Sequence, residues 1–197
     1  MKDFLSLVAG VLFVIAFFPY GKAILSTKKL PSGHPDKVEP AKVSWIIWAV
    51  LDTLTLIGMW IKHAVNGQII AAAFGAWVIV ILAVKYGASK WTKLDKVCLC
   101  GAFTSIALMY VNPVFALVAS LSATFVGAIP TFQSAWNNPA KEDKLAWTIF
   151  WVSCLIALCA VPQWTMADAG QPITFTLIET IIVLLLYIKV RPKRKMR

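Results

Sequence analysis

The chain has 197 residues, of which 59% are hydrophobic and only 14% charged, and its mean hydropathy is +0.76. A soluble domain of this length carries roughly a quarter charged residues, so the composition excludes an ordinary water-soluble fold and predicts a multi-pass membrane protein. Backbone groups inside a bilayer must be satisfied within the chain, which predicts an all-α structure. The net charge of +10 would suggest nucleic acid as a partner in a soluble protein. Here its distribution points to membrane topology instead.

Apolar boundaries predict seven transmembrane helices. In chain order they cover residues 4–20, 43–61, 66–84, 96–111, 114–134, 145–164 and 170–188. The segments between them place 17 basic residues on one side, 11 in loops and 6 in the C-terminal tail, against Lys2 and Lys62 on the other. Because basic loops are retained in the cytoplasm, we predict an outside N-terminus and a cytoplasmic C-terminus in a cell membrane, with a bacterial inner membrane as the expected location. The basic tail is then expected to contact anionic lipid and not nucleic acid.

Two parts of the sequence resemble one another. Pro40-Ala41-Lys42 precedes one apolar span, and Pro139-Ala140-Lys141 precedes another. From Trp48 and Trp151 onward an offset of 103 residues holds, which also aligns Gly67-Gln68 with Gly170-Gln171. Internal repeats in membrane chains are typical of transporter folds, in which the binding site lies between the halves near the bilayer midplane.

The direction of the two copies predicts the organisation of the chain. Both Pro-Ala-Lys motifs fall on the predicted cytoplasmic side, so the copies run in the same direction. Copies of a three-helix unit can do so only if an extra span lies between them. We therefore predict two parallel three-helix repeats in residues 1–90 and 112–197, joined by a linker helix in residues 91–111.

This arrangement of three, one and three helices resembles the SWEET and PQ-loop transporter superfamily over nearly the whole chain, mainly through architecture. The matching local features are prolines expected to end the first and fifth helices, in Phe18-Pro19-Tyr20 and Ile129-Pro130-Thr131. The Pro-Gln dipeptide of that superfamily is absent. The segments 43–48 and 127–132 also resemble a group of bacterial membrane proteins, which implies no function. The superfamily resemblance implies small-solute transport, sometimes proton-coupled, although the superfamily also includes a non-transporting cargo receptor.

Two acidic residues lie deep within predicted spans. Asp52 and Glu179 are each about nine residues from one end of their span, which at 1.5 Å per residue is roughly 14 Å deep. That is close to the midplane of a ~30 Å hydrocarbon core, where a charge is costly and indicates function. No lysine or arginine lies at matching depth. We expect the two acids to handle a proton or a cation, the alternative being that each hydrogen-bonds a neighbouring helix.

Further pathway and hinge residues are predicted from the same spans. Trp48 and Trp151 are deep and aligned in the repeat, so they are candidates to line a cavity, with an interfacial belt of tryptophans as the alternative. Thr124 belongs to a stripe of small and polar residues that either lines a pathway or, as we favour, lets helices pack closely. Pro19, Pro130 and Pro162 lie near the ends of spans and are either hinges or helix ends.

The function that these patterns favour is small-solute transport, with the lipid bilayer and a small-molecule solute as partners. A non-transporting receptor, sensor or scaffold, with the basic loops as its partner surface, is the alternative. We expect no enzyme, because HExxH and GxSxG motifs are absent, and no metal or cofactor, because the four cysteines lack a matched set of ligands. The two leading functions differ in one structural expectation. A transporter should place Asp52, Trp48 and Glu179 around one central space.

Overall fold

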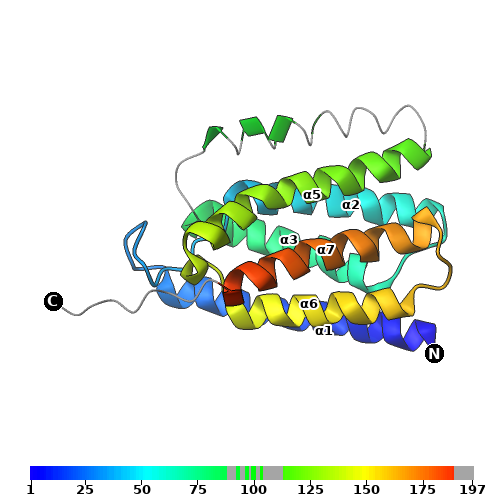
Figure 1. Ribbon diagram of the computed structural model, residues 1–197, viewed down its shortest axis with the longest axis horizontal. Coiled ribbons are helices and arrows are strands. Elements are labelled where there is room, and N and C mark those ends of the chain that lie inside the picture. The colour runs from blue at the N-terminus through cyan, green and yellow to red at the C-terminus, as the bar shows by residue number, and fades with distance from the viewer. Residues whose placement is uncertain (88–91, 94–95, 98, 101–102, 104–112, 189–197) are drawn as a thin grey trace.

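The computed structural model describes residues 1–87, 92–93, 96–97, 99–100, 103 and 113–188, and this part of the chain is helical (Figure 1). Its helices are α1 Lys2–Thr27, α2 Lys42–Ile61, α3 Gly67–Tyr86, α5 Pro113–Asn137, the 3-10 helix η1 Pro139–Lys141, α6 Lys144–Ala160 and α7 Met166–Ile188. The predicted all-α class is confirmed for these residues. Most of the predicted linker helix at 91–111 and the basic tail at 189–197 lie outside the described residues.

Five of the described helices are long and apolar enough to cross a membrane, by length and composition. They are α1, α2, α3, the part of α5 at Leu117–Asn137, and α7, whereas α6 is a shorter apolar helix. Large apolar side chains also lie exposed on the outside of the bundle, such as Phe4 on α1, Phe74 on α3 and Leu177 on α7. Water would make such a surface unfavourable, and lipid would not. The described helices therefore suit a bilayer.

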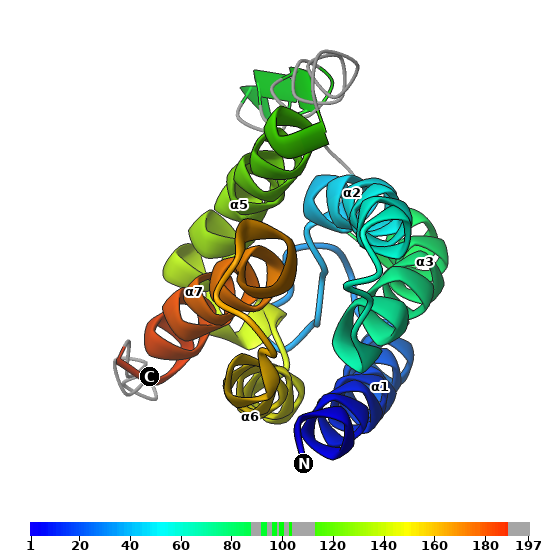
Figure 2. The same cartoon turned by 90° about the vertical axis from the view of Figure 1, so that its right-hand side faces the viewer.

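The helices form a closed ring (Figure 2). Contacts run from α1 to α3, α2, α5, α7, α6 and back to α1. In each predicted half the third helix lies between the first two, because α3 contacts both α1 and α2, and α7 contacts both α5 and α6. The halves meet where α1 packs on α6 and where α2 packs on α5. A twofold axis relating the two predicted halves would produce these same contacts.

The ring has two chemically different ends. The helices α1, α3, α5 and α7 begin at one end, which we call the N-terminal end, while α2 and α6 begin at the other. We call the second the basic end, because most of the described lysines gather there, among them Lys22, Lys28, Lys29, Lys37, Lys42, Lys85, Lys141 and Lys144. Side-chain caps fix where two helices begin at opposite ends. The Asn66 side chain accepts from the amide of Ile69 at the start of α3, and Asp143 accepts from Ala146 at the start of α6.

Pro19 and Pro130 do not end their helices, contrary to the expectation from the sequence. Both lie inside regular helix, and α1 continues to Thr27 and α5 to Asn137. A proline removes one backbone hydrogen bond, but a bilayer offers no water to satisfy an alternative backbone path, so packed neighbours hold the helix together. Pro162 differs, because it lies beyond the end of α6 and its carbonyl accepts a hydrogen bond from Lys2 at 2.9 Å. The predicted hinge role of the three prolines stays a prediction.

The contact between α1 and the start of α3 depends on two glycines. A Cβ atom on Gly10 would lie 2.6 Å from the carbonyl oxygen of Gly67, and one on Gly67 would lie 2.6 Å from that of Ser6. We therefore expect Gly10→Ala to lower the free energy of unfolding by about 1–3 kcal/mol, measured by thermal unfolding in detergent. The matched control is Gly58→Ala within α2, where nothing lies within 4 Å of the added atom and stability should hold or rise slightly. Equal losses in both variants would contradict this account of the contact.

Candidate functional site

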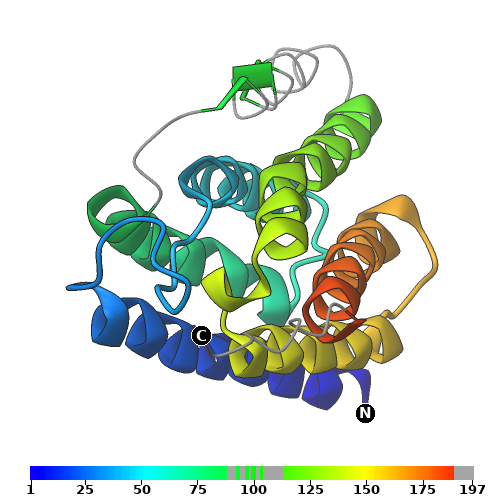
Figure 3. The same cartoon turned by 60° about the vertical axis from the view of Figure 1, so that its left-hand side comes forward.

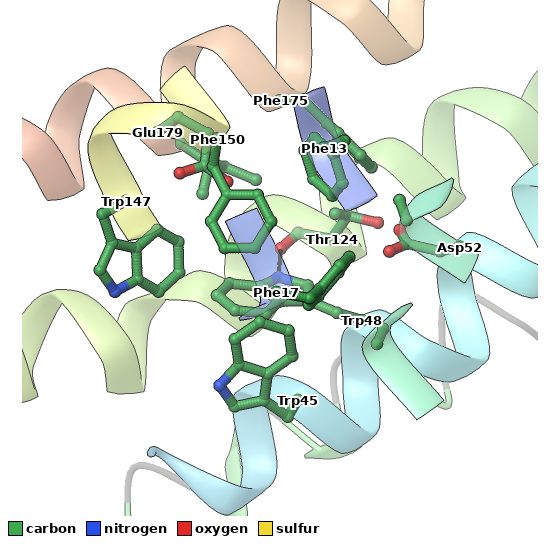
Figure 4. A pocket seen from close by; sticks show the side chains of 13 residues that line it. Phe13, Phe17, Trp45, Trp48, Asp52, Thr124, Trp147, Phe150, Phe175 and Glu179 are labelled. Carbon is green, nitrogen blue, oxygen red and sulfur yellow. Dashed lines mark hydrogen bonds between the residues drawn. The ribbon is translucent and has the colours of Figure 1, made fainter. Parts of the chain in front are cut away.

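A small cavity lies at the centre of the ring, and all six α-helices described contribute side chains to its wall (Figure 4). It leaves about 40 Å³ for the centres of water molecules. One water needs roughly 10–15 Å³ measured in this way, so the cavity has room for about three. Most of the lining is aromatic, from Phe13, Phe17, Trp45, Trp48, Trp147, Phe150 and Phe175.

Both predicted acids line this cavity. Asp52 reaches it from α2 and Glu179 from α7, and Figure 4 shows the two carboxyl groups at opposite sides of the space. The side chains are 5% and 6% exposed, respectively. One oxygen of each, Asp52 Oδ1 and Glu179 Oε2, has no hydrogen-bond partner among the residues that the structure describes. A buried polar atom without a partner costs about 1–3 kcal/mol, so these oxygens are poised for a ligand, a proton or water.

Of the two predicted tryptophans, Trp48 lines the cavity and Trp151 does not. The indole N–H of Trp48 donates to the carbonyl oxygen of Thr124 at 3.0 Å. Trp151 is half-buried, and its indole N–H donates to the hydroxyl of Thr180 on α7 at 3.0 Å. The cavity position on α6 belongs instead to Trp147, one helical turn earlier. From the sequence, the position of Trp147 near the start of its span predicts a place in an interfacial belt, although it shares a helix face with Trp151.

The polar stripe on α5 lies partly at the cavity wall and partly at helix contacts. Thr124 lines the cavity, and its hydroxyl donates to the carbonyl oxygen of Ser120 at 3.0 Å. Ser120 and Thr55 share a hydrogen bond of 2.9 Å between their hydroxyls, which joins α5 to α2. A Cβ on Gly127 would lie 2.5 Å from the Ile47 side chain, so α2 packs closely on α5 there. Most of the stripe therefore packs helices, and Thr124 faces the cavity.

A layer of neutral amides closes the cavity toward the N-terminal end. The side chain of Gln171 donates to the amide oxygen of Gln68 at 2.9 Å, and Gln68 donates to the Ser153 hydroxyl at 3.2 Å. Asn66 donates to Gln171 at 2.8 Å. Gln68 and Gln171 are the pair aligned by the 103-residue offset. Gln68 also lines a second cavity of about 180 Å³ beyond this layer, whereas Ala72, one turn further along α3, lines the central one.

At the basic end the cavity is closed by a carboxylate that sequence reasoning missed. Glu142 is 3% exposed and accepts hydrogen bonds at one oxygen from Tyr20, at 2.8 Å, and from the indole of Trp147, at 2.9 Å. The indole of Trp45 in turn donates to the Tyr20 hydroxyl at 3.3 Å. Burial raises the pKa of Glu142 to about 7, although these hydrogen bonds and Lys141 lower it. The available clue was its position directly after the Pro-Ala-Lys motif.

An ion-pair cluster reinforces the closure at the basic end. Glu39 is 2% exposed and pairs with Lys37 at 3.3 Å and with Lys141 at 3.2 Å. Its backbone N–H also donates to the carbonyl oxygen of Lys141 at 3.1 Å. Figure 3 shows the loop between α1 and α2 lying across this end of the bundle. Because Glu39 directly precedes one Pro-Ala-Lys motif and Lys141 ends the other, the cluster joins the two predicted halves.

The chain matches no protein-family model, no curated protein and no solved structure. Within the described part of the chain, no group of three or more His, Cys, Asp or Glu side chains is arranged to hold a metal ion. Cys154, buried in α6, instead accepts a hydrogen bond from Gln68 at 3.2 Å. Any function has to be argued from the central cavity, its two acids and its two closures.

Proposed function

We propose that the protein transports a small solute across a cell membrane, on a SWEET-like build of two three-helix halves. One observation carries the proposal. Asp52 from the first half and Glu179 from the second line the same cavity, and each leaves one buried oxygen without a partner. Acids buried between packed helices or facing lipid would have favoured a purely structural role.

The two closures provide the gates that alternating access requires. Amide hydrogen bonds separate the central cavity from the larger one at the N-terminal end, while ion pairs and Glu142 close the basic end. Both layers join one predicted half to the other, so rocking of the halves would open one layer while the other holds. With room for about three waters, the cavity corresponds to the state in which both gates are shut.

The proposed orientation places the basic end in the cytoplasm. Lys2 and Lys62 at the N-terminal end oppose the many lysines at the other, which accords with the positive-inside rule. In this orientation the ion-pair cluster is the cytoplasmic gate and the amide layer is the outer gate. The acids between them carry the coupling to a proton or a cation.

Reconstitution into proteoliposomes tests this function. Candidate solutes of neutral, zwitterionic and cationic classes are first ranked by thermal stabilisation of the purified protein, since a ligand stabilises the state that it binds. A pH-sensitive dye in the vesicles then reports proton movement driven by a solute gradient. We expect Asp52→Asn and Glu179→Gln each to lower the flux by about tenfold or more, because each removes an ionisable group at mid-membrane depth.

Asp36→Asn is the matched control for these variants. Asp36 is an exposed acid in the loop between α1 and α2 and lines neither the central cavity nor the cavity at the N-terminal end. Its variant should transport at the wild-type rate. Unchanged solute-driven proton flux in Asp52→Asn would remove Asp52 from the mechanism, and absence of flux for every solute would favour a receptor or sensor.

A further inference from the structure

The hydrogen-bond donors that line the central cavity are already in use. The indoles of Trp45, Trp48 and Trp147 donate to Tyr20, to the Thr124 carbonyl and to Glu142, and the Thr124 hydroxyl donates to Ser120. The remaining lining side chains, apart from the two acids, are apolar. Apart from a protonated Asp52 or Glu179, the described lining residues therefore offer a ligand carboxylate or phosphate no free donor, and the ionised forms of these two acids would repel it.

The acceptors in the cavity are free. Within the described part of the chain, Asp52 Oδ1 and Glu179 Oε2 have no hydrogen-bond partner, and no lysine or arginine lines the cavity. Aromatic faces carry the negative end of a quadrupole, so the seven rings add further attraction for positive charge. The chemistry of the wall thus complements a cation.

Geometry favours an organic cation over a metal ion. Ions such as Ca²⁺ and Mg²⁺ need about six oxygen ligands at short distance. Here Asp52 and Glu179 lie at opposite sides of the space, and the wall between them is aromatic (Figure 4). Trp45 and Trp48 meet edge to face with centroids 5.2 Å apart, and Trp48 and Trp147 meet in the same way at 6.2 Å. A cavity lined in this way suits a weakly hydrated ammonium or guanidinium group.

We propose that the central cavity binds a small organic cation, an ammonium or guanidinium group, between Asp52 and Glu179 and against the tryptophans. Space for about three waters sets its size at roughly three to five heavy atoms. Transport of this cation across the membrane rests on the proposed function, whereas binding of the cation in the cavity does not.

Binding is measured on the full chain in nanodiscs of neutral lipid, with tetramethylammonium as the probe. Its control is tert-butanol, an uncharged molecule of similar shape, and all samples share one ionic strength set with sodium chloride. We expect tetramethylammonium to raise the thermal midpoint and to quench tryptophan fluorescence saturably, and tert-butanol to do neither. Asp52→Asn should weaken binding by roughly tenfold or more, because the paired charge is lost.

Two tryptophan variants distinguish a cation–π contact in the central cavity from a general effect on helix packing. Trp48→Leu should weaken binding by about threefold to thirtyfold through loss of a cation–π contact. Trp60→Leu on the same helix should leave it unchanged, because Trp60 is exposed on the outside of the bundle. Equal responses to tetramethylammonium and tert-butanol, or full binding in Asp52→Asn, would overturn the proposal and leave a proton as the ligand of the acids.

The two proposals fail separately. Saturable cation binding in nanodiscs without flux in proteoliposomes would overturn transport and support the cation site, as in a receptor. Proton-linked flux of a neutral solute, with no binding of tetramethylammonium, would support transport and overturn the cation site.

Discussion

Raising the pH from 5 to 8 is expected to lower the stability of the protein by roughly 2–3 kcal/mol through Glu142. Burial raises its pKa to about 7 in the folded chain, against 4.5 for an exposed glutamate. The folded state therefore binds the proton more tightly than the unfolded state. The stabilisation that this proton gives to the folded state is complete below about pH 4.5 and is lost as the pH rises through about 7. Thermal or chemical unfolding in detergent across this range measures it.

Glu142→Gln should abolish most of this pH dependence. The amide oxygen can still accept from Tyr20 and Trp147, but no charge forms in the buried site. The variant should therefore be more stable than the wild type at pH 8 and close to it at pH 5. The neighbouring charged groups are Lys141 and Asp143, and Lys141 in turn pairs with Glu39. An unchanged slope in Glu142→Gln would contradict the assignment of the pH dependence to Glu142.

In the proposed transport function, the same proton would couple to the gate at the basic end. Opening this gate would expose Glu142 to water and return its pKa toward the ordinary value, so opening releases a proton near neutral pH. Low pH then favours the shut gate. This gives the cytoplasmic side, in the proposed orientation, a pH response that is separate from Asp52 and Glu179.

The parts of the site that the sequence predicted share one physical cause. A carboxylate inside a long apolar span is energetically costly, so Asp52 and Glu179 can be recognised in the sequence whichever way their helices face. Trp48 lies four residues before Asp52 and shares its helix face, so its place in the cavity follows from Asp52. Span length and apolar content likewise suffice to predict helices that suit a bilayer.

The parts that it missed depend on contacts between distant segments. Glu142 stands beside Lys141 and Asp143 in what reads as a solvated loop, and its burial involves a contact with Tyr20, 122 residues away. Trp147 and Trp151 are one turn apart, and the packing of α6 against α1 and α7 decides which of them faces the cavity. Proline often ends a helix in water, and this expectation fails for α1 and α5, which continue past Pro19 and Pro130.

Reversing the charge of Glu39 should destabilise the closure at the basic end strongly. Glu39→Lys removes two ion pairs and brings a third lysine next to Lys37 and Lys141. Breaking one partner of a fully buried pair costs about 3–5 kcal/mol, and partial exposure of Lys141 reduces this to roughly 2–4 kcal/mol here. Burial alone would raise the pKa of Glu39, but hydrogen bonds from Ser32, Lys141 and Lys37 outweigh it and lower the pKa. The carboxylate is therefore charged at neutral pH, and the loss should appear in full there.

A charge exchange tests whether the pair itself is responsible. Adding Lys141→Glu to Glu39→Lys restores one attraction across the two predicted halves, so the double variant should recover about half of the lost stability or more. Adding Lys22→Glu instead gives the same net charge without an acid at the position of Lys141, and should recover little. Unfolding midpoints at pH 7 are compared for the wild type, Glu39→Lys and the two double variants. Equal recovery with Lys22→Glu would mean that net charge at the basic end matters and not the contact, and the cluster would then lose its proposed role as a gate.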